Sequence, residues 1–186
     1  DCKLSALMAE SGLSYDFAKH SFGYYTDIDS YHEANWRLSL SAGYRYQRFD
    51  FECDNLNQTS PSGARPDRVG WWPQTVVNYA IDYELPYLKA GIQTWNDHIR
   101  CEAAAGWIPI ALVSDRDEHI IRSKVSEGDT RGNGYLASFK VRLELNKSWA
   151  LNCLFDYTRV LTEGTQHQMI GGSSPEIIDI DQEISS

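Results

Sequence analysis

The sequence predicts an all-β protein built as an antiparallel up-and-down β-barrel, and two observations support this fold class. Side chains alternate between apolar and polar along several segments, and the connections between these segments alternate between short and long. A period of two is typical of a strand with one apolar and one polar face. In residues 36–46 the apolar face carries Trp36, Leu38, Leu40, Ala42, Tyr44 and Tyr46. The 186 residues suffice for one domain, so we expect a single barrel domain over 1–186.

Six segments have the composition and alternation expected of strands. They lie at about 22–33, 36–52, 75–95, 98–113, 125–145 and 149–162. Residues 1–21 and 167–186 lack a clear pattern and are expected to be loop or tail.

The connections suggest a barrel that crosses a membrane. The expected turns at 34–35, 96–97 and 146–148 are short, whereas the connections at 53–74, 114–124 and from 163 onward are long and rich in Gly, Pro, Ser and charge. Short turns at one end and long loops at the other are typical of transmembrane barrels. A soluble meander, sandwich or small barrel is the alternative, and composition slightly favours it because soluble proteins are more common.

Composition narrows the range of partners. The formal net charge is −9 and there is no basic run, which argues against nucleic acid. Aromatic residues make up 12% of the chain, and they favour both strands and membrane interfaces. No metal site is expected, because Cys2, Cys53, Cys101 and Cys153 lack metal-type spacing and so do the histidines. Disulfides are possible, but the spacing does not decide between pairings.

The segment 114–125 concentrates the groups that could do chemistry. It holds Asp115, Asp117, Glu118 and His119 in the connection between two apolar segments. A histidine two residues from an aspartate can act as a base at neutral pH, and a loop would expose it to substrate. The alternative is solvated charge, which is the usual role of such a short motif.

Five motifs, taken in order, resemble one family of barrels. They are Ala42-Gly43-Tyr44 with Arg48, Tyr83 to Tyr87, Ser114 to His119, Arg122 to Val125, and Arg159-Val160. In this order and spacing they resemble the omptins, which are ten-stranded outer-membrane aspartate–histidine endopeptidases of Gram-negative bacteria. The resemblance covers about residues 24–166 and corresponds to the family's fourth to ninth strands. It implies a transmembrane β-barrel of omptin type, apparently truncated, in the cell outer membrane and in contact with its lipid.

The resemblance also implies an activity and its residues. Asp117 and His119 match the catalytic pair, in which neutral His119 would take a proton from a water attacking the scissile carbonyl while Asp117 orients the imidazole. Asp115 matches the carboxylate that receives a basic side chain of the substrate. The expected substrates are therefore peptides or proteins with basic residues, and no metal or organic cofactor is implied.

Lipopolysaccharide is implied as a possible activator, since Tyr44 and Arg48 match part of the family's lipopolysaccharide-binding site. The alternative is an ordinary interfacial tyrosine with a snorkelling arginine. The sequence departs from the family here, with Tyr46 in place of an acid and Asp82 in place of a base. An aspartate at such a site would repel a lipid phosphate.

A second catalytic pair of aspartates, D-x-D, precedes the family's fourth strand on the facing wall. Asp27-Ile28-Asp29 has this spacing, but the alignment puts it inside a strand, where we expect it to face the lumen. Two alternatives to the enzyme follow. One is a catalytically inactive omptin-like barrel acting as an adhesin or structural protein, and the other is a soluble ligand-binding β-barrel.

Overall fold

The strands form one long antiparallel sheet. A computed structural model describes residues 1–27, 30–58, 70–72, 74–171 and 176–185. Its strands are β1 (Cys2–Asp27), β2 (Ser30–Cys53), β3 (Leu56–Gln58), β4 (Gly70–Trp72), β5 (Val77–Trp95), β6 (Ile99–His119), β7 (Lys124–Glu144), β8 (Ala150–Ile170) and β9 (Glu176–Ser185). Seven of them pair in the order β1-β2-β5-β6-β7-β8-β9, and β3 pairs with β4 beside this sheet.

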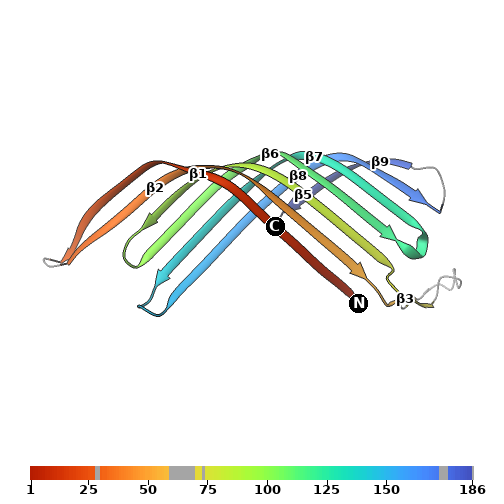
Figure 1. Ribbon diagram of the computed structural model, residues 1–186, viewed down its shortest axis with the longest axis horizontal. Helices are drawn as coiled ribbons and strands as arrows, with labels where there is room; N and C mark the ends of the chain where they lie inside the picture. Colours follow the sequence, from red (N-terminus) through yellow and green to blue (C-terminus); the bar gives the residue numbers. More distant parts are fainter. Residues whose placement is uncertain (28–29, 59–69, 73, 172–175, 186) are drawn as a thin grey trace.

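The topology is up-and-down, as predicted. In Figure 1 the strands arch across the view, with the β5–β6 and β7–β8 turns at the left and the β6–β7 connection at the right. The only helical segment among the described residues is the short 3-10 turn η2 (Ile120–Arg122) between β6 and β7. No helix there is long and apolar enough to cross a membrane.

The prediction that residues 1–21 form a loop or tail is wrong. Residues 2–27 form β1, which pairs with β2 from Cys2 opposite Cys53 to Asp27 opposite Ser30. The pattern was hard to read because a bulge between Asp16 and Ala18 shifts the alternation by one residue.

The first predicted strand and turn are also misplaced. β1 ends at Asp27 and β2 begins at Ser30, both inside the predicted strand 22–33, and the predicted turn at 34–35 lies within β2. The aromatic residues before and after this boundary favour strands, and no Gly or Pro lies in the sequence between β1 and β2. Of the D-x-D at 27–29, Asp27 is the last residue of β1, and the other two residues lie outside the described part.

The prediction that residues 167–186 form a tail is wrong as well. β8 continues to Ile170, and β9 pairs with it from Glu176 opposite Gln168 to Ser185 opposite Arg159. The adjacent isoleucines Ile177 and Ile178 interrupt a strict alternation in β9. The pairing of β9 with β8, rather than its local alternation, identifies it as a strand.

The sheet curls toward one face. Arg45 Nη1 on β2 donates a hydrogen bond to Thr158 Oγ1 on β8 at 3.0 Å, although β5, β6 and β7 lie between these strands. In a flat sheet four strand spacings would separate them by about 19 Å, which no arginine can span. We call the face that carries Arg45 and Thr158 the inner face, and the opposite one the outer face.

The two faces differ in polarity in the half of the sheet near the tight turns. Large apolar side chains are exposed on the outer face, among them Tyr15, Leu40, Ile92, Trp107, Tyr135, Phe139, Leu151 and Phe155. The inner face in the same half carries Asp16, Lys19, Arg37, Lys89, Glu102, Lys140 and Arg142. Strands that are apolar outside and polar inside are the pattern of membrane barrels, and a soluble barrel has the reverse.

The apolar band also has the height of a membrane. On β6 the exposed apolar residues run from Ile99 to Ile110, beyond which the outer face carries Ser114, Arg116 and Glu118. This run is roughly 36 Å long, or about 27 Å along a barrel axis at a typical tilt. An outer-membrane apolar band is about 25 Å tall. The end of the sheet that carries the β6–β7 connection therefore stands above the band.

The inner face of that upper half is packed. Ile81, Tyr83, Leu85, Tyr87, Ile108, Ala111, Val113, Leu136 and Val160 form one buried cluster. Buried hydroxyls beside the cluster satisfy each other, since Thr130 Oγ1 lies 2.9 Å from Thr162 Oγ1.

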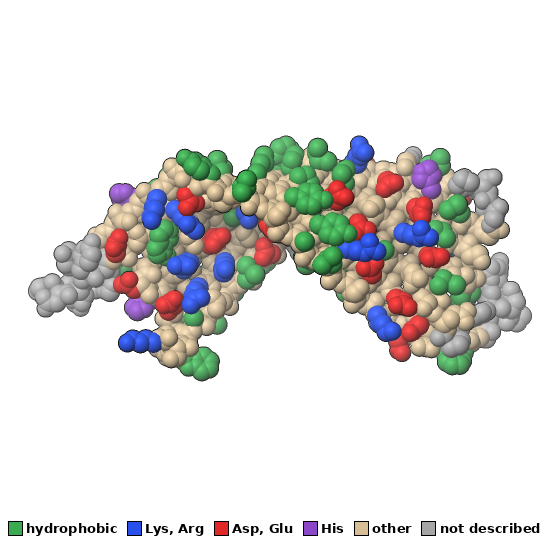
Figure 2. Space-filling model, in the orientation of Figure 1, with side chains coloured by type: hydrophobic (Ala, Val, Ile, Leu, Met, Phe, Trp, Pro, Cys, Tyr) green, Lys and Arg blue, Asp and Glu red, His purple; other side chains and the backbone are tan. Residues whose placement is uncertain are grey.

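In Figure 2 acidic and basic side chains are interspersed over both arms of the arch, so neither arm presents charge of a single sign on the side in view.

Candidate active site

Strand β6 carries Asp115, Asp117 and His119 to the inner face. The prediction that 114–124 is a loop is wrong, because β6 continues to His119 and β7 starts at Lys124. Pairing on both sides extends the strand, with His119 opposite Val77 of β5 and opposite Lys124 of β7. The three side chains are two residues apart and therefore point to the same face.

Asp117 and His119 are in contact. His119 Nε2 lies 3.1 Å from Asp117 Oδ2, and the two side chains are 31% and 25% exposed. The Asp117 carboxylate thus contacts Nε2 of the His119 imidazole, and the second ring nitrogen is Nδ1. Such a pair, partly exposed and fixed on a strand, can orient a neutral imidazole as a proton acceptor.

Asp115 lies deeper in the same row of side chains. It is 7% exposed and faces Ile81 on β5 and Gly128 on β7. A methyl group at Gly128 would collide with Asp115 Oδ1, so the glycine leaves the space that the carboxylate occupies. The result is a buried acid beneath the Asp117–His119 pair.

Strand β7 adds residues that the sequence did not single out. Ser126 lies directly opposite Asp117 and is 1% exposed, and its Oγ has no hydrogen-bond partner within the described part of the chain. On the other side of Asp117 lies Tyr79 of β5. Only the register between strands could have found these residues.

Tyr44 and Arg48 lie away from the Asp117–His119 pair, on the outer face of β2. Arg48 forms ion pairs with Asp50 at 2.9 Å and with Asp82 of β5 at 3.3 Å. Asp82 also accepts a hydrogen bond from the hydroxyl of Tyr46. The guanidinium is therefore already bound by two carboxylates, and Tyr44, four residues away on the same face of β2, is 41% exposed.

A disulfide joins β1 and β2 at the end of the sheet that also carries the Asp117–His119 pair. Cys2 at the start of β1 is bonded to Cys53 at the end of β2, while Cys101 and Cys153 are free thiols. This settles the pairing that the spacing had left open. The described residues contain no group of three or more His, Cys, Asp or Glu side chains that could hold a metal ion.

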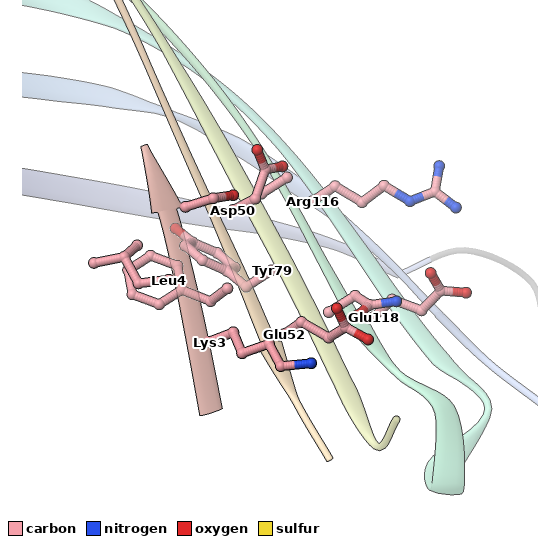
Figure 3. A pocket seen from close by; sticks show the side chains of 11 residues that line it. Lys3, Leu4, Asp50, Glu52, Tyr79, Arg116 and Glu118 are labelled. Atoms are coloured by element: carbon pink, nitrogen blue, oxygen red, sulfur yellow. The ribbon is translucent and has the colours of Figure 1, made fainter. Parts of the chain in front are cut away.

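A cavity of about 590 Å³ lies close to the candidate site, and most of its lining residues belong to the outer face. Figure 3 shows its charged side chains, which come from β1, β2 and β6: Lys3, Asp50, Glu52, Arg116 and Glu118. Arg116 and Glu118 alternate with Asp117 and His119 along β6 and therefore project to the outer face. The charged side chains of the cavity therefore face away from the Asp117–His119 pair, although Tyr79 also lines it.

Comparison with known proteins supports the fold. No family model and no curated protein matches the chain. Among solved structures, the chain is similar to a transmembrane barrel enzyme.

That structure is the crystal structure of the outer membrane protease OmpT from Escherichia coli. The TM-score is 0.59 and the identity is 14%, and the match covers 94% of this chain and 72% of that chain. At this identity the likeness shows the fold alone. The fold is thus an antiparallel up-and-down transmembrane β-barrel of omptin type, as predicted, and the described strands form an open part of one.

Proposed function

We propose that the protein is an outer-membrane endopeptidase that cleaves peptides at basic residues, with water activated by Asp117 and His119. The observation that carries the proposal is the 3.1 Å contact between His119 Nε2 and Asp117 Oδ2 on the inner face above the apolar band. The omptin-type fold supports it, because the neighbour of known structure is a protease.

The proposed reaction is a direct attack of water on the peptide. His119 Nδ1 accepts a proton from the water as its oxygen bonds to the scissile carbonyl carbon. Asp117 holds the imidazole through Nε2 and stabilises the cation that forms. His119 then gives the proton to the leaving nitrogen as the carbon–nitrogen bond breaks. The products are a carboxylic acid and an amine, and no covalent enzyme intermediate is needed.

Asp115 is proposed to select basic side chains. Its carboxylate lies at the floor of the site and is 7% exposed, so a long side chain must reach down to it. Arginine and lysine can do so and form a charge-assisted hydrogen bond there. The net charge of −9 would add a general attraction for basic peptides.

The outer membrane is the proposed location. The outward apolar band suits lipid, and the Cys2–Cys53 disulfide suits a compartment outside the reducing cytoplasm. The site would then lie above the membrane, at the end of the sheet that carries the β6–β7 connection.

Lipopolysaccharide remains a proposed ligand of Tyr44 and Arg48. Because Asp50 and Asp82 already bind the guanidinium, a lipid phosphate would have to displace at least one of these carboxylates. We therefore expect weaker activation than an unpaired arginine would give.

The proposal is tested with detergent-refolded protein and a quenched peptide that contains Arg-Arg. His119→Ala should abolish cleavage, whereas His167→Ala should not. His167 is the matched control, because it pairs with Glu127 on the outer face of β8, near the same end of the sheet. Equal loss in both variants, or none in either, would contradict the assignment. A folded wild-type protein without cleavage would instead favour the inactive barrel acting as an adhesin or structural protein.

A further inference from the structure

One buried side chain at the site has no partner. Ser126 is 1% exposed, and its Oγ neither reaches solvent nor forms a hydrogen bond within the described residues. A buried hydroxyl without a partner costs about 1–3 kcal/mol relative to one that is hydrogen-bonded. The other buried hydroxyls of this face are satisfied, since Thr130 contacts Thr162 at 2.9 Å and Arg45 donates to Thr158 at 3.0 Å.

The register places this hydroxyl next to the Asp117–His119 pair. Ser126 lies directly opposite Asp117 on the inner face, and Gln168 of β8 lies on its other side. Directly opposed side chains in an antiparallel pair have Cβ atoms about 4.5–5.5 Å apart. A change of χ1 in Ser126 or Asp117 can therefore bring the hydroxyl within hydrogen-bond distance of the carboxylate.

We propose that Ser126 is a positioning residue, which donates its hydroxyl hydrogen to the Asp117 carboxylate when the site is in its working arrangement. The inference rests on the proposed function. Asp117 already holds His119 through Oδ2, and a second donor fixes the rotation of the carboxylate and hence of the imidazole. Ser126 does not touch substrate in this arrangement, because its Oγ is enclosed.

Removal of the hydroxyl separates this role from a structural one. In Ser126→Ala an unsatisfied buried group disappears, so the midpoint of thermal unfolding should stay the same or rise. The kcat for the Arg-Arg peptide should fall at least tenfold, with KM within about twofold of the wild-type value. Ser126→Thr keeps the hydroxyl and should restore most of the kcat. Ser138→Ala is the matched control, because Ser138 is on the same face of β7, opposite Ala104 and Asp156 and far from the pair.

A second measurement does not depend on cleavage. The imidazole NMR resonances of the five histidines are recorded at fixed pH in histidine-labelled protein. The resonances that disappear in His119→Gln are assigned to His119. Ser126→Ala should shift the His119 resonances, and Ser138→Ala should not. Unchanged resonances would overturn the proposal, even with a lower kcat, because the effect would not pass through Asp117. If the wild-type protein cleaves no peptide, the proposed function fails, and the resonances alone decide the role of Ser126.

Discussion

Replacement of Gly128 by alanine should selectively weaken the use of basic substrates. The added methyl group would occupy the space of Asp115 Oδ1, and Asp115 is 7% exposed, so the carboxylate cannot move freely into solvent. Overpacking of this kind costs about 1–3 kcal/mol, and each 1.4 kcal/mol corresponds to a factor of ten. We therefore expect kcat/KM for an arginine-containing peptide to fall by roughly 5- to 150-fold, chiefly through KM.

The assay compares two peptides that differ only in arginine or glutamine at the position next to the cleaved bond. Gly128→Ala should reduce the preference for arginine, while Gly91→Ala should leave it unchanged. Gly91 is a suitable control, because a methyl group there comes no closer than 3.1 Å to any neighbour, the Ser39 hydroxyl, and meets Ala103 O and Ala104 Cβ at an ordinary 3.5 Å. A folded Gly128→Ala variant that keeps the full arginine preference would refute the reasoning about Asp115.

Three further predictions concern the membrane, the lipid and the disulfide. Phe155→Arg, on the outer face of β8, should lower the free energy of unfolding in vesicles by about 2–4 kcal/mol. Leu154→Arg, on the inner face one residue away, should leave this free energy nearly unchanged. Equal effects of the two replacements would contradict the assignment of the faces. Asp82→Asn should release Arg48 from one ion pair and so increase the activation of peptide cleavage by added lipopolysaccharide. Arg48→Ala should decrease this activation. Identical activation in both variants would show that these residues do not bind the lipid. Replacement of both Cys2 and Cys53 by serine should lower the free energy of unfolding by about 2–4 kcal/mol in urea titrations. Cys101→Ser, which removes a free thiol, should change this free energy little. No effect of the double replacement would mean that the disulfide does not constrain the unfolded chain.

The central part of the fold could be predicted because its strands alternate strictly. The hairpins around 96–98 and 145–149 were located from short polar turns between alternating segments. β1 was missed because its bulge between Asp16 and Ala18 shifts the alternation. β9 was missed because the adjacent Ile177 and Ile178 interrupt its alternation, although it pairs with the preceding strand β8. Local periodicity reports only strands that keep one register.

The candidate site was predictable to the same extent. Asp117 and His119 were singled out by their spacing, but their common face follows from the continuation of β6 to His119, where a loop was predicted. The position of Ser126 opposite Asp117 depends on the register between β6 and β7, which no local pattern reveals.

The pairing of Arg48 likewise depends on a neighbouring strand. Asp82 was noted in the sequence as a departure from the family, but its contact with the guanidinium follows from the register of β2 with β5. Long-range pairing thus decides which carboxylates bind this arginine on the outer face.

The most direct test of the central claim is to map every bond that the refolded protein cleaves in an unbiased peptide mixture, by mass spectrometry, beside His119→Ala and His167→Ala. The account predicts cleavage next to arginine or lysine by the wild-type protein and by His167→Ala, and none by His119→Ala. Cleavage that persists in His119→Ala, or that shows no preference for basic residues, would contradict it.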